Sequence, residues 1–273
     1  METKTYTLKC PDYRVGSFVV CAPPNDKSVV PQFERGVYET NVQKLFCGIV
    51  EEGMSVCDIG ANFGQHTALF SKLVGKDGRV FAVEASQINS QYVRQTVVAN
   101  ACGNVDVIGR GVWSHDTELT FSHVEGAEAT SFCSTKSDIR QIEPNPACKY
   151  QTISVSPLDD LVAVPVDFAK FDIEGAELFA VKGASRMLEN RPPTLVEINS
   201  FTYKTFTDVE ISDMIDYMLE FGYSHMYAYV NNQWLEVTRN MILAMFTRQH
   251  MLIDVLFTTR RRKSSDFRHK RRR

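Results

Sequence analysis

The sequence predicts an α/β fold in which helices cover both faces of a mostly parallel sheet. Its length of 273 residues and its hydrophobic content of 44% are enough for one substantial core. Predicted strands alternate with predicted helices through most of the chain, which is typical of parallel sheets. The last predicted strands follow one another across short turns, which indicates an antiparallel end to the sheet.

The chain divides into three parts. Residues 1–36 form an N-terminal extension, residues 37–258 form the main domain, and residues 259–273 form a basic tail. Within the main domain, residues 122–147 are a polar insert without periodicity, which is typical either of a lid over a site or of a disordered loop.

The first half of the main domain begins with a helix. Apolar side chains at helical spacing predict this helix over residues 38–50, and Gly53 follows its end. The elements expected after it are strand 55–59, helix 65–74, strand 79–83, helix 89–99, strand 105–108 and strand 118–121.

The second half continues the alternation and then changes to antiparallel strands. The capping-box pattern from Thr207 to Glu210 predicts the start of one helix, and Gly222 ends it. The other expected elements are strand 167–171, helix 176–181, strand 194–198, and the antiparallel strands 223–230, 234–237 and 241–246.

Charge is distributed unevenly along the chain. The net charge is -3, but residues 260–273 hold nine Lys or Arg and one Asp, which leaves 21 basic and 32 acidic residues, a net charge of -11, on the rest. Such an acidic body argues against a nucleic-acid reader, whose folded surface would be basic. The tail is a solvated end, a nuclear-targeting signal or a contact for a polyanion.

The sequence shows no sign of secretion or membrane insertion. It lacks a signal-peptide pattern and any apolar run of the roughly 20 residues that span a bilayer. The seven cysteines are scattered without a C-x-x-C pair, so we expect neither disulfides nor a zinc site, and we predict no metal site. We expect a cytoplasmic protein, with nuclear entry through the basic tail as the alternative.

The segment CDIGANFGQHT, residues 57–67, ends a predicted strand and opens a helix. In open parallel sheets, this edge binds ligands. Gly60 and Gly64 allow the backbone to approach a ligand, and the free N–H groups of the first helical turn, which includes His66 and Thr67, favour an anionic group. The loop therefore suits a nucleotide-like cofactor.

Two kinds of cofactor compete for this loop. A dinucleotide needs G-x-G-x-x-G, but Asn62 and Gln65 occupy the second and third glycine positions, which disfavours NAD and FAD. S-adenosylmethionine carries an ammonium group and a ribose diol. Asp58 could face that ammonium group, and Glu84, at the end of the next strand, could accept two hydrogen bonds from the ribose. The two acids together favour S-adenosylmethionine.

A second acidic motif, KFDIEGAE, covers residues 170–177. If its strand lies beside strand 55–59, as in doubly wound sheets, Asp172 and Glu174 emerge next to the cofactor. Two acids there could orient the cationic end of the cofactor, accept a proton or hold a divalent cation. In the alternative, one of them only caps the following helix.

Together these stretches resemble the FkbM-type family of S-adenosylmethionine-dependent methyltransferases. The match runs from about residue 36 to residue 246, and the pairing of D-x-G-A-N-x-G with K-x-D-x-E-G-A-E is specific. The resembling residues are Tyr38-Glu39, Asp58 to Gly64 with Thr67, Val83-Glu84, Asn100, Leu158 to Asp160, Lys170 to Glu177 and Glu197 to Asn199. Ala85 departs from the expected proline, and the polar insert and the tail lie outside the family pattern.

The resemblance implies a Rossmann-like class I methyltransferase fold, with seven strands in the order 3-2-1-4-5-7-6 and the last strand antiparallel. It also implies O-methylation, so the expected partner is a hydroxyl acceptor, either a small molecule or a glycan. The expected cofactor residues are Asp58, Gly60, Asn62, Gly64, Thr67, Glu84 and Asp172, and Asp172 and Glu174 are expected to border the methyl group.

Methyl transfer from a sulfonium is an in-line displacement, and a base beside the acceptor hydroxyl would assist it. Glu174 is the first candidate for this base, Asp172 the second and His66 the third. Lys170 is expected to be structural and to pair with Glu174 or Glu197.

Two other functions are alternatives to the methyltransferase. An NAD-dependent oxidoreductase would use the same loop and Glu84, but it lacks the required glycines. A noncatalytic binding protein on a methyltransferase scaffold would use its basic tail on an anionic partner. Affinity for S-adenosylmethionine over NADH would exclude the first, and removal of residues 260–273 would test the second.

Overall fold

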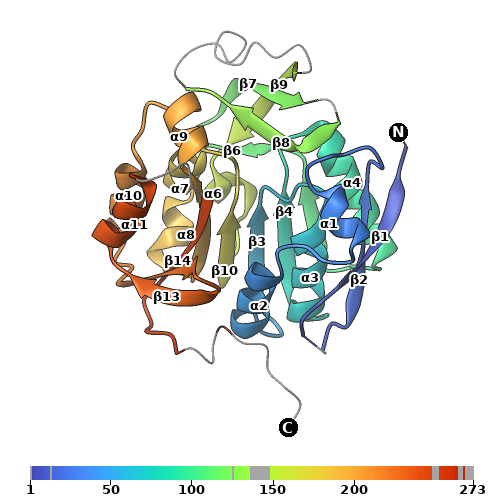
Figure 1. The fold of residues 1–273 in the computed structure, drawn as a ribbon, viewed down its shortest axis with the longest axis horizontal. Coiled ribbons are helices and arrows are strands. Elements are labelled where there is room, and N and C mark those ends of the chain that lie inside the picture. The colour runs from blue at the N-terminus through green and yellow to red at the C-terminus, as the bar shows by residue number, and fades with distance from the viewer. Residues whose placement is uncertain are drawn as a thin grey trace.

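The computed structural model describes residues 2–12, 14–124, 126–135, 148–247, 252–263 and 267. A twisted eight-stranded sheet forms the centre of the molecule (Figure 1). Its strands are β3 (Ser55–Ile59), β4 (Arg79–Val83), β5 (Val105–Ile108), β10 (Phe168–Phe171), β11 (Thr194–Asn199), β12 (His225–Val230), β13 (Gln233–Val237) and β14 (Leu252–Thr258).

The order of these strands confirms the fold class. From one edge to the other the order is β13-β12-β14-β11-β10-β3-β4-β5, which is the predicted order with one additional edge strand, β13. Strand β14 is antiparallel to both of its neighbours, and β13 is antiparallel to β12. The fold is therefore Rossmann-like, with eight strands instead of seven.

Strand β14 lies between β12 and β11 in the sheet, and the sequence prediction missed it. The predicted strand over residues 241–246 is wrong, because these residues belong to helix α11 (Arg239–Phe246). The Thr238 side chain caps this helix by accepting a hydrogen bond from the Met241 N–H, and Ile242 anchors it in the core. A short apolar run does not distinguish a helix from a strand, and here the N-cap decides.

Helices cover both faces of the main sheet (Figure 1). Side chains of one strand alternate between two cores, so that Val56 and Phe168 face one core while Cys57 and Ala169 face the other. The first face carries α2 (Thr40–Ile49), α3 (Gln65–Val74) and α4 (Gln87–Ala99). The second carries α6 (Leu158–Leu161), α7 (Glu177–Lys182), α8 (Ser185–Glu189), α9 (Ser200–Phe206), α10 (Ile211–Glu220) and α11.

The N-terminal segment packs onto the first face as a hairpin. Strands β1 (Lys4–Lys9) and β2 (Ser17–Ala22) pair in antiparallel register, and α1 (Val30–Glu34) follows them. Leu8, Phe18 and Val20 are buried in the same core as α3. The Asn100 side chain, at the end of α4, both accepts from the N–H of Val19 and donates to its carbonyl.

A second sheet lies across one end of the main sheet (Figure 1). It consists of β6 (Gly111–Val112), β7 (Thr117–Val124), β8 (Ala127–Cys133) and β9 (Cys148–Ser156), in the order β6-β9-β7-β8. Residues 122–124 and 127–133 of the predicted insert form parts of β7 and β8, so these residues are not a disordered loop, and the alternative of a lid over a site stays a prediction. Residues 136–147 of the predicted insert lie outside the described residues.

Helix α10 begins three residues later than predicted. Glu210 is the N-cap, and its capping box is formed with Asp213 instead of starting at Thr207. The Thr207 hydroxyl donates to the carbonyl of Tyr203, because an additional helix, α9, ends at this point.

Part of the basic tail is packed against the sheet. Phe267 is buried against Tyr227 and Trp234, and the N–H of Arg262 donates to the Tyr227 hydroxyl. The remaining predicted tail residues, 264–266 and 268–273, lie outside the described residues. Among the helices that the structure describes, none is long and apolar enough to cross a bilayer.

We expect Asn100→Ala to lower the free energy of unfolding by about 1–3 kcal/mol, because it removes the hydrogen bonds between α4 and the hairpin. Gln91→Ala, on the exposed face of α4, is the matched control and should change it by less than about 0.5 kcal/mol. Urea denaturation measures both values. Equal values would show that the hairpin is not held through Asn100.

Candidate functional site

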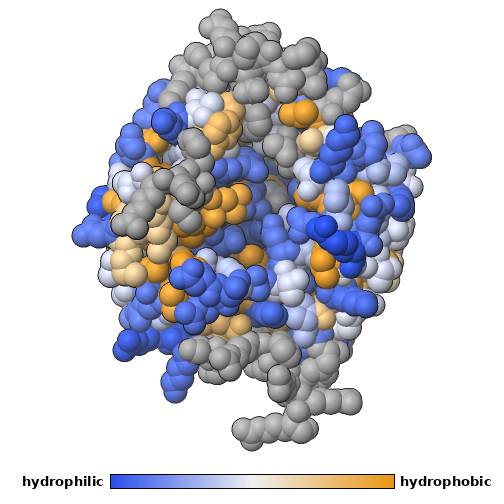
Figure 2. Space-filling view, in the orientation of Figure 1, coloured by the Kyte–Doolittle hydropathy of each residue, from blue (hydrophilic) through white to orange (hydrophobic). Residues whose placement is uncertain are grey.

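A cavity of about 240 Å³ lies between the carboxyl edge of the main sheet and the second sheet. Figure 2 shows that this face is hollowed near its centre, where β3 ends in Figure 1. Residues from the main sheet and its loops line one side: Ile59, Gly60, Asn62, Val83, Glu84, Asp172, Ile173, Glu174 and Glu197. Residues from the second sheet line the other: Val112, Leu119, Phe121, Ser131, Cys133, Ile153 and Val155.

Two loops cross at the floor of this cavity. Gly60 has a left-handed φ of 82°, and a Cβ atom on it would overlap the carbonyl oxygen of Asp172. The Asp172 N–H in turn donates to the carbonyl of Ile59. Gly60 lines the cavity, and its missing side chain also leaves room for the backbone of the loop after β10, which is a second reason for glycine at this position.

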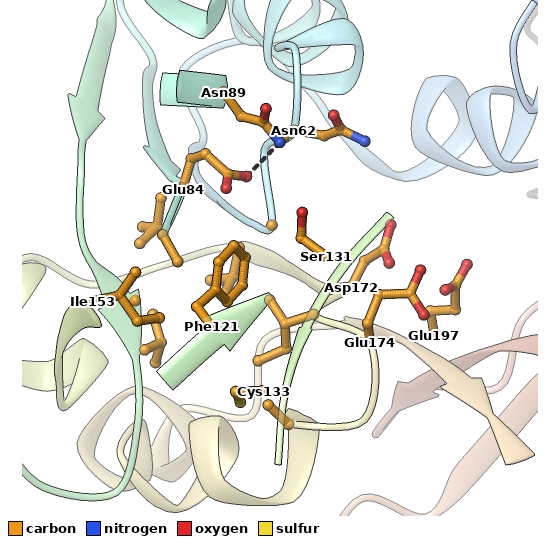
Figure 3. A pocket seen from close by; sticks show the side chains of 18 of the residues that line it. Asn62, Glu84, Asn89, Phe121, Ser131, Cys133, Ile153, Asp172, Glu174 and Glu197 are labelled. Atoms are coloured by element: carbon orange, nitrogen blue, oxygen red, sulfur yellow. Dashed lines mark hydrogen bonds between the residues drawn. The ribbon is translucent and has the colours of Figure 1, made fainter. Parts of the chain in front are cut away.

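Glu84 points into the cavity from the end of β4 (Figure 3). One of its carboxylate oxygens accepts from the N–H of Asn62 and the other from the N–H of Ser86, each at 2.8 Å. Burial raises the pKa of Glu84 to about 7, although both hydrogen bonds favour the charged form. Each oxygen can accept one further hydrogen bond, so the residue can bind two hydroxyl groups.

Asp58, Gly64 and Thr67, three of the predicted cofactor residues, lie behind the cavity wall instead of lining it. The Thr67 hydroxyl donates to Asp58 at 2.6 Å, and Asp58 is fully buried. Burial raises the pKa of Asp58, and the charge of Lys170 and the Thr67 hydrogen bond oppose this effect. Gly64 packs against Thr96 of α4. These residues support the loop that carries Asn62.

His66 also lies away from the cavity. Its ring packs among Tyr38, Phe46 and Phe70 and is 2% exposed. Burial holds its pKa well below the usual value, and Lys170 adds to the effect. Its Nε2 atom is 3.4 Å from a carboxylate oxygen of Glu39. The placement disfavours the predicted role as a base, because the ring does not reach the cavity.

Three carboxylates converge at one end of the cavity (Figure 3). Oxygen atoms of Asp172, Glu174 and Glu197, which we call the carboxylate triad, all lie within 4.8 Å of one another. Burial raises the pKa of Glu174 to about 7, and burial followed by the charge of Asp172 raises that of Glu197 well above its usual value. Three acidic groups are thus concentrated at one end of the cavity, where their ionised forms would favour a positively charged ligand.

Lys170 lies beside the triad but pairs differently from the prediction. Its ammonium group is 2.8 Å from Asp172 and 3.8 Å from Asp58, instead of pairing with Glu174 or Glu197. Burial lowers its pKa, but the charges of Asp172 and Asp58 outweigh burial and raise the pKa overall. Lys170 therefore remains charged and holds the ends of β3 and β10 together.

Two further carboxyl groups face the same region. Burial, followed by the charges of Asp254 and Asp172, raises the pKa of Glu39 to about 8. Burial, followed by the charge of Asp172, raises the pKa of Asp254 to about 7. Several acidic groups therefore lie in this region. Among the described residues, the one ammonium group in contact with them is that of Lys170.

The loop that carries Glu174 is held by hydrogen bonds to the side chain of Glu177, at the start of α7. Glu177 is 1% exposed and accepts from the N–H groups of Ile173 and Gly175. Glu174 itself has a left-handed φ of 54°, and its carboxylate accepts from the Asn199 side chain at 3.2 Å. The strained backbone is therefore fixed on both sides, which is common at functional sites.

The sequence predicted the floor of the cavity better than its other walls. It identified Asn62, Glu84, Asp172 and Glu174, which all line the cavity, but not Glu197 as a site residue. The signal for Glu197 was an acid in the middle of an otherwise apolar strand. The strand over residues 118–121 was predicted, but Leu119 and Phe121 were missed as site residues because the pairing that places this strand over the cavity was not predicted.

Comparison with known proteins gives a match to one family. Residues 58–224 match the Methyltransferase FkbM domain. A search of curated proteins finds no match.

Solved structures give weaker similarities. A methyltransferase FkbM from Methylobacillus flagellatus KT is 20% identical, with a TM-score of 0.47, over 75% of this chain and 43% of that chain. The chain therefore spans less than half of that protein's length. A SAM-dependent methyltransferase from Aquifex aeolicus is 14% identical, with a TM-score of 0.44, over 86% and 94%. A putative methyltransferase from Streptococcus mutans, in complex with SAH, is 11% identical, with a TM-score of 0.44, over 78% and 93%.

We expect Gly60→Ala to lower the free energy of unfolding by about 2–5 kcal/mol, because it adds a clash with Asp172 to the cost of a left-handed alanine. Gly53→Ala is the matched control, because Gly53 has nearly the same φ, 83°, with no atom near the added Cβ. It should lose only about 1–2 kcal/mol. Chemical denaturation measures both, and equal losses would contradict the close crossing of the two loops.

Proposed function

The chain belongs to the FkbM methyltransferase family, and we propose that it transfers a methyl group from S-adenosylmethionine to a hydroxyl oxygen of a sugar or another small metabolite. One observation carries the proposal. One cavity has Glu84, which can accept the hydrogen bonds of a ribose, at one end and the carboxylate triad at the other.

The residues around Glu84 fit the nucleoside part of the cofactor. Glu84 has two free acceptor positions for the ribose diol, and the Asn62 side-chain oxygen beside it is buried without a hydrogen-bond partner. Val83, Val112 and Phe121 supply an apolar wall for a flat base. The cavity thus offers both the polar and the apolar contacts that an adenosine group requires.

The acidic end of the cavity fits the cationic part of the cofactor. When bound, S-adenosylmethionine supplies a methyl group made electrophilic by its sulfonium. Asp172 lines the cavity directly beyond the glycine loop, and Lys170 fixes one of its oxygens. The other oxygen can face a positive charge, as buried carboxylates require.

The same end binds the acceptor in our proposal. Glu174 and Asp172 can each accept a hydrogen bond from the acceptor hydroxyl and take up its proton, which makes the oxygen a better nucleophile. Leu119, Phe121 and Ile153 of the second sheet cover the cavity and exclude water from it. His66 has no part in this scheme, because it does not line the cavity.

Calorimetric titration of the purified protein with S-adenosylmethionine, and of a parallel sample with NADH, tests the cofactor. We expect saturable binding of S-adenosylmethionine alone. A panel of sugars and hydroxylated metabolites is then screened by mass spectrometry for a methylated product. Binding of NADH alone would contradict the proposal, and binding of neither would favour the noncatalytic alternative.

We expect the affinity for S-adenosylmethionine to fall about tenfold as the pH is lowered from 8 to 6. The pKa of Glu84 is raised to about 7, so the carboxylate that accepts both ribose hydrogen bonds is present above this pH and is lost below it. Calorimetry at several pH values measures this change.

Glu84→Gln should bind about tenfold or more weakly at pH 8 and show little change between pH 8 and pH 6, because the amide does not titrate there. Glu220→Gln, at the exposed end of α10, is the control and should behave like the wild type. A Glu84→Gln variant that retains the pH dependence would show that another group binds the ribose.

A further inference from the structure

The carboxylate triad has the geometry of a binding site for one ion. Asp172 and Glu174 follow β10 and Glu197 lies on β11, and these two strands pair directly in the main sheet. The sheet therefore holds the three carboxylates in place, and their oxygens lie within 4.8 Å of one another (Figure 3). Three like charges this close repel one another unless a cation or protons separate them.

Glu197 provides a second observation. Its side chain is 9% exposed and lines the cavity, yet it has no hydrogen bond or ion pair with any described residue. A buried carboxylate without a partner is unfavourable, and such groups in proteins are paired or coordinate metals. Its carboxylate is therefore available for a ligand inside the cavity.

The other two carboxylates are each held by one oxygen. Lys170 donates to Oδ2 of Asp172 at 2.8 Å, and Asn199 donates to Oε2 of Glu174 at 3.2 Å. In each case the second oxygen remains for a ligand. This arrangement is typical of metal sites, where outer residues orient the carboxylates that bind the ion.

The distances fit a small divalent cation. An octahedral ion with ligands at about 2.1 Å has neighbouring ligand oxygens about 3 Å apart and opposite ones about 4.2 Å apart. Both separations fall within the 4.8 Å that the triad spans. Three carboxylate ligands, without histidine or cysteine, select ions such as Mg²⁺, Mn²⁺ or Ca²⁺.

We propose that Asp172, Glu174 and Glu197 bind one divalent cation, and that the remaining positions of this ion bind hydroxyl oxygens of the methyl acceptor. The ion site stands on the geometry of the triad, whereas its role toward the acceptor rests on the proposed function. The acceptor is then an oxygen-rich molecule that offers one or two hydroxyls to the ion. When the ion is bound, Asp172 and Glu174 act on the acceptor through it, and this replaces the direct contacts of their free oxygens with the acceptor hydroxyl and the cofactor that are described under the proposed function.

Titration of the metal-free, full-length protein with Mn²⁺, followed by electron paramagnetic resonance of the free ion, tests the site without cofactor or acceptor. We expect one Mn²⁺ per chain, displaced by excess Mg²⁺ or Ca²⁺. Absence of stoichiometric binding would overturn the proposal.

Glu197→Gln and Glu174→Gln should each weaken Mn²⁺ binding at least about tenfold, because each removes a charged ligand. Asp254→Asn is the matched control, because Asp254 lies opposite Glu197 on β14 but does not line the cavity. It should weaken binding by no more than about threefold, because it is not a ligand. Equal weakening in all three variants would indicate diffuse negative charge and would contradict coordination.

Thermal unfolding shows whether the Glu197→Gln variant is folded, so that weaker Mn²⁺ binding is not mistaken for misfolding. Glu197→Gln should unfold at or above the wild-type temperature without metal, because it removes a buried carboxyl group that has no partner among the described residues. Mn²⁺ should raise the unfolding temperature of the wild type but not that of the variant. An equal rise in both would overturn the assignment of Glu197 as a ligand.

The outcomes separate this inference from the proposed function. Binding of S-adenosylmethionine together with no binding of Mn²⁺ would reject the ion site and leave the methyltransferase proposal intact. Binding of Mn²⁺ without binding of S-adenosylmethionine would support the ion site and contradict the cofactor assignment.

Discussion

The contact between the loop after β3 and the loop after β10 determines where everything else in the site can lie. The two strands are parallel neighbours, and their loops leave the sheet at the same edge. They fit only because residue 60 has no side chain, so the backbone of Asp172 can lie against it. From this crossing, Asn62 is directed toward Glu84, and Asp172 is directed toward Glu174 and Glu197. The spacing between the two ends of the cavity is therefore a property of the backbone.

The acidic end of the cavity shows how a fold can hold unfavourable charge. Burial disfavours ionised carboxylates, yet five acidic residues, Glu39, Asp172, Glu174, Glu197 and Asp254, lie near one another, and of these Asp172 forms an ion pair with Lys170. The large apolar cores on both faces of the sheet supply the stability that such a group requires. Concentrated charge of this kind is more useful for binding than for folding.

Local sequence patterns predicted the elements whose periodicity is local. Helix 65–74 and strands 79–83 and 105–108 coincide with α3, β4 and β5. Other segments depend on pairing: β7 extends beyond the predicted strand 118–121 by pairing with β8 and β9, and β14 is inserted between strands that precede it in the chain. For the same reason Asp172 and Glu174 could be predicted from one motif, whereas Glu197 joins them only through the pairing of β10 with β11. The close approach of the Asp172 backbone to Gly60 could not be predicted, because a missing side chain does not reveal what lies beside it.

The second sheet has a consequence for how specificity can change during evolution. Its strands β7, β8 and β9 come from one continuous part of the chain, whereas Glu84 and the triad come from the ends of the main strands. Substitutions at Leu119 and Ile153 would alter the apolar wall of the cavity without moving Glu84 or the carboxylate triad. The shape of the cavity can therefore change through one contiguous segment of the chain, while the residues at the ends of the main strands stay the same.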